Sequence, residues 1–225
     1  MTDRGGAPAG DPIVKGERRA PVVLTILVAI ALPLLMPPAV SHGERWIVAG
    51  AEAVLLVVML VLDPGRIDEA SPTAHRVRLA LVAVLAVGAA VASVRLVGVI
   101  LDGGAGSNDA RDLFRAGGLV WLNVIIAFGF AYWELDGGGP GRRVRAPRLH
   151  PDFQFAQDAN PALAPAGWRP HFVDYLYVSF CAAMCFGPAD TLPLARWAKL
   201  TLAVESMSSL FILGLVLARG VNILS

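Results

Sequence analysis

Long apolar runs separated by short polar stretches dominate the chain. Four of these runs cover residues 21–40, 46–62, 79–101 and 119–134, and a later one covers 194–217. A helix needs about 20 mainly apolar residues to cross a bilayer, which is close to the length of each run. Pro33, Pro37 and Pro38 are expected to kink or end the first helix. The pattern predicts an all-α integral membrane protein with four transmembrane helices and a long C-terminal helix.

One apolar run, at 172–186, is too short to cross a bilayer comfortably. It carries several aromatic residues and ends at a tight break, Gly187-Pro188-Ala189-Asp190. These features favour a re-entrant helix and loop, whose backbone is tolerated at membrane depth only where protein or a water-filled cavity covers it. The alternative is a full crossing, which would give six spans and place both termini on the same side.

The order of outer helix, short helix, break and long final helix comes with specific residue matches. The short helix opens with Asp174 and Tyr177-x-Ser179-Phe180, the break is followed by Pro193, and the last helix carries Ala195-Arg196, Glu205 and Ala218-Arg219. In these features the chain resembles the pore module of the two-helix potassium-channel family. The resemblance implies a filter-like loop made of Cys185, Phe186, Gly187, Pro188, Ala189, Asp190 and Thr191.

The loop departs from the filter sequence of that family. Where the family has Thr-Val-Gly-Tyr-Gly, residues 185–189 read Cys-Phe-Gly-Pro-Ala. An ordered stack of carbonyl rings is therefore not expected, and the resemblance implies a degenerate, weakly selective pore for monovalent cations. The pore would need a homo-oligomer, a tetramer if it follows the family. Residues 186–191 and the C-terminal end also resemble a group of uncharacterised bacterial multi-pass membrane proteins.

Two residues of the break have competing interpretations. Asp190 would contribute to a ring of carboxylates at the mouth of a pore, where acidic rings concentrate cations. Alternatively, Asp190 or Thr191 caps the last helix, since side-chain oxygens before a helix accept its free backbone N–H groups. Gly187 lets the backbone turn so that carbonyls face a pore axis, or it serves only in a plain turn.

The last helix carries an acid, Glu205, well inside its apolar run. Acids within a membrane are costly, so they usually face a partner or water. Glu205 and Ser209 share a helix face, with Ser208 at its edge, and this face would line a pore. Alternatively, Glu205 is a buried, hydrogen-bonded acid that holds the short helix in place.

Two more charges, Glu52 and Arg95, fall within the second and third predicted helices. A mutual ion pair between the two helices is the simplest interpretation. In the alternative, Arg95 extends along its helix to the membrane interface.

The distribution of charged residues in the loops indicates the topology. The apolar runs and the polar segments between them divide the chain into four parts. Most Lys and Arg residues lie in the N-terminus, the 63–78 link and the 135–171 segment, whereas the opposite side has Arg45, Arg111 and Arg115. The positive-inside rule then predicts a cytoplasmic N-terminus. The resemblance to bacterial membrane proteins implies that the membrane is a bacterial inner membrane. We expect a flexible tail at 1–20, a four-helix transmembrane region at 21–134, an Arg/Pro-rich surface loop at 135–171 and the pore-like module at 172–225.

Composition supports the membrane class and limits the chemistry. The chain has 225 residues, of which 56% are apolar and 16% charged, and its mean hydropathy is +0.60. Its basic residues lie beside apolar segments, which favours lipid contacts and gives no indication of nucleic-acid binding. Cys181 and Cys185 alone do not form a zinc site. No catalytic or nucleotide-binding motif is present, so neither an enzyme, a metal nor a cofactor is expected.

Two alternatives to a conducting pore remain at this level. The altered filter favours a non-conducting membrane scaffold, subunit or small-molecule binder that keeps a channel-like fold. A small transporter or membrane enzyme would instead use Glu205 as a proton site.

Overall fold

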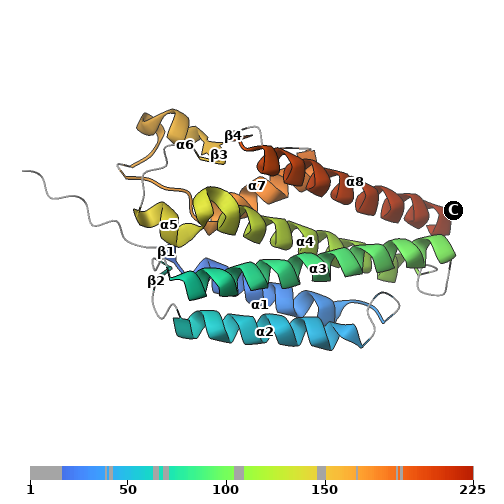
Figure 1. The fold of residues 1–225 in the computed structure, drawn as a ribbon. Coiled ribbons are helices and arrows are strands. Elements are labelled where there is room, and N and C mark those ends of the chain that lie inside the picture. Colours follow the sequence, from blue (N-terminus) through green and yellow to red (C-terminus); the bar gives the residue numbers. More distant parts are fainter. Residues whose placement is uncertain are drawn as a thin grey trace, which may run out of the picture.

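The computed structural model describes most of the chain. The described residues are 17–38, 40, 43–62, 66–67, 71–103, 109–145, 151–165, 167–185, 187 and 190–224, with the side chains of residues 44, 66, 67, 144, 145 and 185 left out. The longer helices are α1 (Ala20–Leu35), α2 (Glu44–Leu62), α3 (Pro72–Asp102), α4 (Ala110–Leu135), α7 (Phe172–Cys185) and α8 (Arg196–Leu224). The first four run back and forth along a bundle, and α7 and α8 complete it (Figure 1).

Short elements gather at one end of this bundle. They are β1 (Glu17–Arg18), β2 (Arg66–Ile67), η2 (Asp136–Gly138), α5 (Pro140–Arg145), β3 (Phe153–Phe155), α6 (Ala156–Ala159), η3 (Pro161–Leu163) and β4 (Thr191–Pro193). The strands form two antiparallel pairs, β1 with β2 and β3 with β4. In the second pair Phe153 lies opposite Pro193 and Phe155 lies opposite Thr191.

Local sequence explains where several helices begin and end. The side chain of Asp109 accepts hydrogen bonds from the backbone N–H of Arg111 (2.8 Å) and of Asp112 (3.4 Å), which caps α4. Proline stands in the first turn of both α1 and α3, where its missing N–H costs nothing. The first helix ends at Leu35, before the expected residue 40, because two prolines follow it closely.

The centre of the bundle is α4, which packs against α1, α3, α7 and α8. This arrangement is visible in Figure 1, where α4 runs between α3 on one side and α7 and α8 on the other. Gly129 allows α7 to approach closely, because a Cβ placed there would lie 3.2 Å from the Cα of Leu176. A helix with neighbours on several sides buries side chains all around its circumference, so α4 is the scaffold for the elements that follow.

Within the described residues, four helices are long and apolar enough to cross a membrane. They are α2, α3, α4 with the residues just after it, and α8, whereas α1 and α7 are shorter apolar helices. The expected membrane class is therefore compatible with the fold. The third helix begins at Pro72 rather than at 79, so that residues expected in a polar link form its first turns.

Both α7 and α8 begin at the same end of the bundle. Strand β4, just before α8, pairs with β3, and the backbone N–H of Leu194 donates to the carbonyl oxygen of Asp152 (2.8 Å). At the start of α7, Tyr175 donates its hydroxyl proton to Asp136, which also accepts from the backbone N–H of Asp152 (3.0 Å). The C-terminus lies at the opposite end (Figure 1).

Candidate functional site

A buried carboxylate joins the three helices of the pore-like part. Glu205 of α8 has no exposed surface, and its Oε2 accepts a 2.6 Å hydrogen bond from the hydroxyl of Tyr132 in α4. Its Oε1 contacts the hydroxyl of Ser179 in α7, which also lies 2.7 Å from the carbonyl oxygen of Ile125. Glu205 therefore has the arrangement expected of a buried acid that holds the short helix in place.

Further contacts fix the height and rotation of α7. One turn beyond Ser179 on α7, the carbonyl oxygen of Ala182 accepts a 2.9 Å hydrogen bond from the hydroxyl of Ser206 in α8. Ser179 and Ser206 are both buried, so these hydrogen bonds form without competition from water. Ala182 lies near the end of α7 but Ser206 lies well before the middle of α8, so α7 ends about half-way along its neighbour. A helix of 14 residues is about 21 Å long, which is shorter than a bilayer core.

The polar face predicted for a pore lumen is packed inside the chain. Glu205, Ser209, Ile212 and Val216 are all buried. Ser208, at the edge of this face, instead lines a groove of about 330 Å³ between α3, α4 and α8, where its hydroxyl is satisfied by the carbonyl oxygen of Val204 (2.8 Å). The face of α8 that is exposed is apolar. A single chain thus directs the polar side of its last helix inward, toward α4 and α7.

The break between α7 and α8 is described only in part. Phe186, Pro188 and Ala189 lie outside the described residues, as does the side chain of Cys185. Gly187 has φ +147°, a backbone conformation that side chains other than hydrogen rarely adopt. Asp190 is exposed, whereas the next residue, Thr191, is 2% exposed and opens β4.

The capping interpretation of the break is wrong. Because β4 stands between Asp190 and the helix, α8 begins only at Arg196, and neither Asp190 nor Thr191 is at its N-terminal cap. The start of α8 is held from elsewhere, since Oδ1 of Asp152 accepts a 3.1 Å hydrogen bond from the indole N–H of Trp197.

An aromatic and acidic clasp fixes the shared end of α7 and α8. We use this name for Glu17, Trp133, Asp136, Arg143, Asp152, Phe153, Phe172, Tyr175 and Trp197. Phe153 has no exposed surface and its ring lies 5.2 Å from that of Tyr132 and 5.7 Å from that of Trp197. The guanidinium of Arg143 stacks 4.9 Å from the ring of Tyr175 and donates to the carbonyl oxygens of Trp133 (2.7 Å) and Asp136 (2.6 Å).

The N-terminal part of the clasp comes from a residue expected in a flexible tail. Glu17 is 8% exposed and accepts hydrogen bonds from the indole N–H of Trp133 (2.9 Å) and from the backbone N–H of Phe172. Burial raises the pKa of the Glu17 carboxyl, while the N–H of Phe172, the Trp133 indole, and the nearby charges of His171 and Arg143 oppose that rise. The first residue of α7 is therefore tied to the beginning of the described chain.

A second buried carboxylate lies at the same end of the bundle. Glu134 has no exposed surface and accepts a 3.0 Å ion-pairing hydrogen bond from Nε of Arg78. Its other oxygen lies 2.6 Å from Nδ1 of His75, whose side chain is partly exposed. This group was not expected from the sequence, because Arg78 lies in the 63–78 stretch predicted as a polar link. The sequence signal for this group is Glu134, an acid at the end of the fourth apolar run.

The structure does not form the ion pair expected between Glu52 and Arg95. Glu52 is 1% exposed, and its Oε2 has no hydrogen-bond partner among the described residues. Arg95 lies further along its own helix and lines a cavity with Arg45 and Asn123. The two helices pack in a register that places Gly88, not Arg95, against the face of α2, with Val48 only 3.1 Å from a Cβ built on Gly88.

Comparison with known proteins gives no match for this chain, whether among protein families, curated proteins or solved structures. Within the part of the chain that the structure describes, no three His, Cys, Asp or Glu side chains are grouped so that they could hold a metal ion.

Proposed function

We propose that this chain is a channel-like membrane protein that assembles into a homo-oligomer around the 185–191 break and conducts monovalent cations with weak selectivity. The observation that carries the proposal is the shared starting end of α7 and α8. It supports a re-entrant path for α7, which ends about half-way along α8. The break then returns from that depth, where its backbone must be covered by protein or must line water.

Symmetry supplies what one chain lacks. One short loop encloses nothing, but copies arranged about an axis form a closed ring of loops. Asp190 is exposed, so each copy adds one carboxylate to a ring that attracts cations. The tetramer is the stoichiometry that the resemblance to two-helix potassium channels implies. With one glycine in the break, discrimination between sodium and potassium is expected to be small.

Cation flux into liposomes tests the proposal. The purified oligomer is expected to carry potassium and sodium at similar rates, and Asp190→Asn is expected to lower both by weakening cation attraction at the ring. Asp112→Asn removes an exposed acid outside the break and should leave the flux unchanged. An intact oligomer without any flux would contradict conduction.

Side-specific labelling tests the re-entrant arrangement separately. In a background with Cys181 and Cys185 replaced by Ala, Asp190→Cys should react with an impermeant maleimide from the same side as Arg142→Cys. Asp102→Cys, at the far end of α3, should react from the opposite side. In the proposed topology the Arg142 side is the cytoplasm of a bacterial inner membrane. Labelling of Asp190→Cys together with Asp102→Cys would contradict re-entry.

A second candidate is a non-conducting membrane scaffold or subunit that keeps this fold. The buried polar face of α8 favours it, because Glu205 and Ser209 are used for packing within the chain. The exposed face of α8 carries apolar side chains such as Val204, Met207 and Phe211, which suit lipid or another apolar helix. Native mass spectrometry separates the candidates: a monomer supports the scaffold, and a closed oligomer supports the pore.

A further inference from the structure

Glu52 differs from the other buried acids of the described residues. It lies near the middle of α2 and is 1% exposed, yet its Oε2 has no hydrogen-bond partner among those residues. The other buried acids each accept a hydrogen bond from a side chain of another element, and they are Glu17, Glu134, Asp136 and Glu205. Glu52 is therefore buried without the contacts that accommodate a charge at the other four positions.

The helices that pack against α2 are α1 and α3, and α1 brings no charge to Glu52. The sequence of α1 contains no charged residue, and its Thr25 hydroxyl donates to a carbonyl oxygen of the same helix (2.9 Å). On α2 itself, the next buried residue on the same face is Leu56. From α4, the polar side chain that reaches the cavity beside Val48 is the neutral amide of Asn123.

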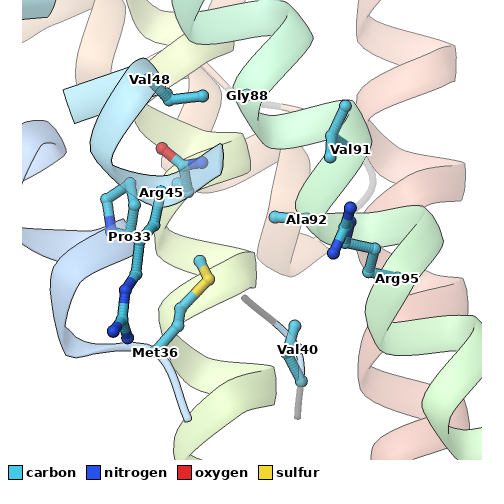
Figure 2. A pocket seen from close by; sticks show the side chains of 10 residues that line it. Pro33, Met36, Val40, Arg45, Val48, Gly88, Val91, Ala92 and Arg95 are labelled. Atoms are coloured by element: carbon cyan, nitrogen blue, oxygen red, sulfur yellow. The ribbon is translucent and has the colours of Figure 1, made fainter. Parts of the chain in front are cut away.

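The register of α2 and α3 keeps two arginines away from Glu52. Val48 of α2 packs against Gly88 of α3, and Figure 2 shows Arg45 and Arg95 on one side of this contact. Glu52 lies one turn beyond Val48 on α2, on the other side of the contact. Because α2 and α3 run in opposite directions (Figure 1), Glu52 is level with the part of α3 that precedes Gly88, near residue 84.

Axial separations put the remaining charges of α3 and α2 at a distance. A helix rises about 1.5 Å per residue, so Arg78 starts about 9 Å and Arg95 about 16 Å from the level of residue 84. Arg78 is already paired with Glu134. Farther along α3 are His75, Arg76 and Asp102, and Arg45 stands two turns before Glu52 on α2. Within the described part of the chain, no ion pair reaches Glu52.

We propose that Glu52 is a proton-binding site, which holds one proton as a neutral carboxylic acid while α2 is packed against α1 and α3. A charged carboxylate in an apolar interior is strongly unfavourable unless it is paired or hydrogen-bonded, whereas the neutral acid is accommodated at much smaller cost. Release of the proton therefore requires α2 to move and water or a cation to enter. Proton uptake and the packing of α2 are coupled by this requirement. The site is separate from the proposed pore.

Infrared spectroscopy of the purified full chain tests the proposal directly. At pH 7, the difference spectrum between the wild type and Glu52→Gln should contain the carbonyl band of one protonated carboxylic acid. Asp102→Asn removes an exposed acid at the end of α3, and its difference spectrum should contain carboxylate bands instead. Carboxylate bands alone in the Glu52→Gln difference would overturn the proposal.

Unfolding temperatures of two neutral variants give a second test. Glu52→Gln and Glu52→Leu should both unfold within about 3 °C of the wild type, because a neutral acid without a partner has no hydrogen bond or ion pair to lose. Glu205→Leu, which removes the acceptor of a buried hydrogen bond, should unfold at a clearly lower temperature. If both Glu52 variants fail to fold, or lose as much as Glu205→Leu, then Glu52 is charged and paired in the folded protein and the proposal is wrong.

Reaction with dicyclohexylcarbodiimide gives a readout on the wild type alone. The carboxyl proton moves to a nitrogen of the reagent while the carboxyl oxygen bonds to its central carbon, and rearrangement gives a stable N-acylurea, so the whole reagent adds and no group leaves. Mass mapping is expected to locate the adduct at Glu52. Sodium or potassium, compared with choline at equal ionic strength, should not slow the reaction. Protection by either metal ion would show that a cation occupies the site in place of the proton, and would also overturn the proposal.

Discussion

Tyr132 and Glu205, residues 73 positions apart, are joined by a buried hydrogen bond of 2.6 Å. The bond links α4 to α8, and the same carboxylate contacts Ser179 of α7. One acid therefore holds together the three helices on which the proposed function depends. Its removal has effects that can be measured without knowledge of any transported ion.

Replacement of Glu205 by Leu should destabilise the protein more than replacement by Gln. Leu leaves the hydroxyl of Tyr132 buried without an acceptor, at a cost of about 1–3 kcal/mol, whereas Gln keeps an acceptor oxygen. The free energy of unfolding in mixed detergent measures both. Ser208→Ala is the control, because the hydroxyl of Ser208 bonds only within its own helix. Equal losses for Leu and Gln would show that the hydrogen bonds contribute little.

Two glycines of α4 should respond in opposite ways to alanine. A Cβ on Gly129 would lie 3.0 Å from Leu176 Cδ1 and 3.2 Å from its Cα, so Gly129→Ala should cost about 1–3 kcal/mol by pushing α7 away. Gly118 has no neighbouring atom within 4 Å of such a Cβ, and Gly118→Ala should stabilise by up to about 1 kcal/mol. Thermal unfolding of the pair measures the difference, and matching shifts would contradict the close packing of α7.

Loss of Arg78 should be much more costly than loss of its neighbour Arg76. Arg78 is 2% exposed and pairs with Glu134, which is fully buried. Arg78→Ala removes the buried cation, leaves only the partly exposed His75 beside the carboxylate, and should lower the free energy of unfolding by about 3–5 kcal/mol. Arg76→Ala, on an exposed side chain, should change it by less than about 0.5 kcal/mol. Similar effects for both variants would indicate that the Glu134 carboxyl becomes protonated when Arg78 is lost and therefore needs no cation.

The net contribution of Glu17 to stability should fall as the pH rises. Burial raises the pKa of Glu17, so the folded protein binds this proton more tightly than the unfolded chain does. The contribution of Glu17 to stability is therefore largest at acidic pH, and it declines from the ordinary glutamate range up to the raised pKa. Unfolding of the wild type and of Glu17→Gln from pH 4 to 8 measures this, and the variant should lack the decline. A wild type that gains stability over this range relative to Glu17→Gln would contradict the prediction.

The sequence predicts the long helices well because length and apolar content alone decide them. The second helix was expected at 46–62 and is found at Glu44–Leu62, and the short helix expected at 172–186 is found at Phe172–Cys185. Errors occur where polar residues belong to a helix, as at the start of α3. Arg78 is helical there because Glu134, from a different helix, neutralises it.

The clasp could not be predicted from local pattern. Its contacts join residues far apart in the chain, such as Glu17 and Trp133, which are separated by 116 positions. A single sequence shows no periodicity for such pairs. The segment expected as an Arg/Pro-rich surface loop also contributes Phe153, which is fully buried. By contrast, the role of Glu205 as a buried acid behind the short helix was among the alternatives that the sequence left open, since an acid inside an apolar helix requires a partner.

The two ends of α8 are held by different kinds of contact. At its start, β4 pairs with β3 and the indole of Trp197 bonds to Asp152, so directional bonds fix that end. Toward its C-terminus, Val216 and Gly220 pack closely against Gly117 and Phe114 of α4. Apolar surfaces can slide over one another at small cost, whereas strand pairing cannot. Because directional bonds fix its start beside the break, and buried bonds at Glu205 hold it to α4 and α7, α8 acts as a rigid arm whose displacement is transmitted to the break through β4.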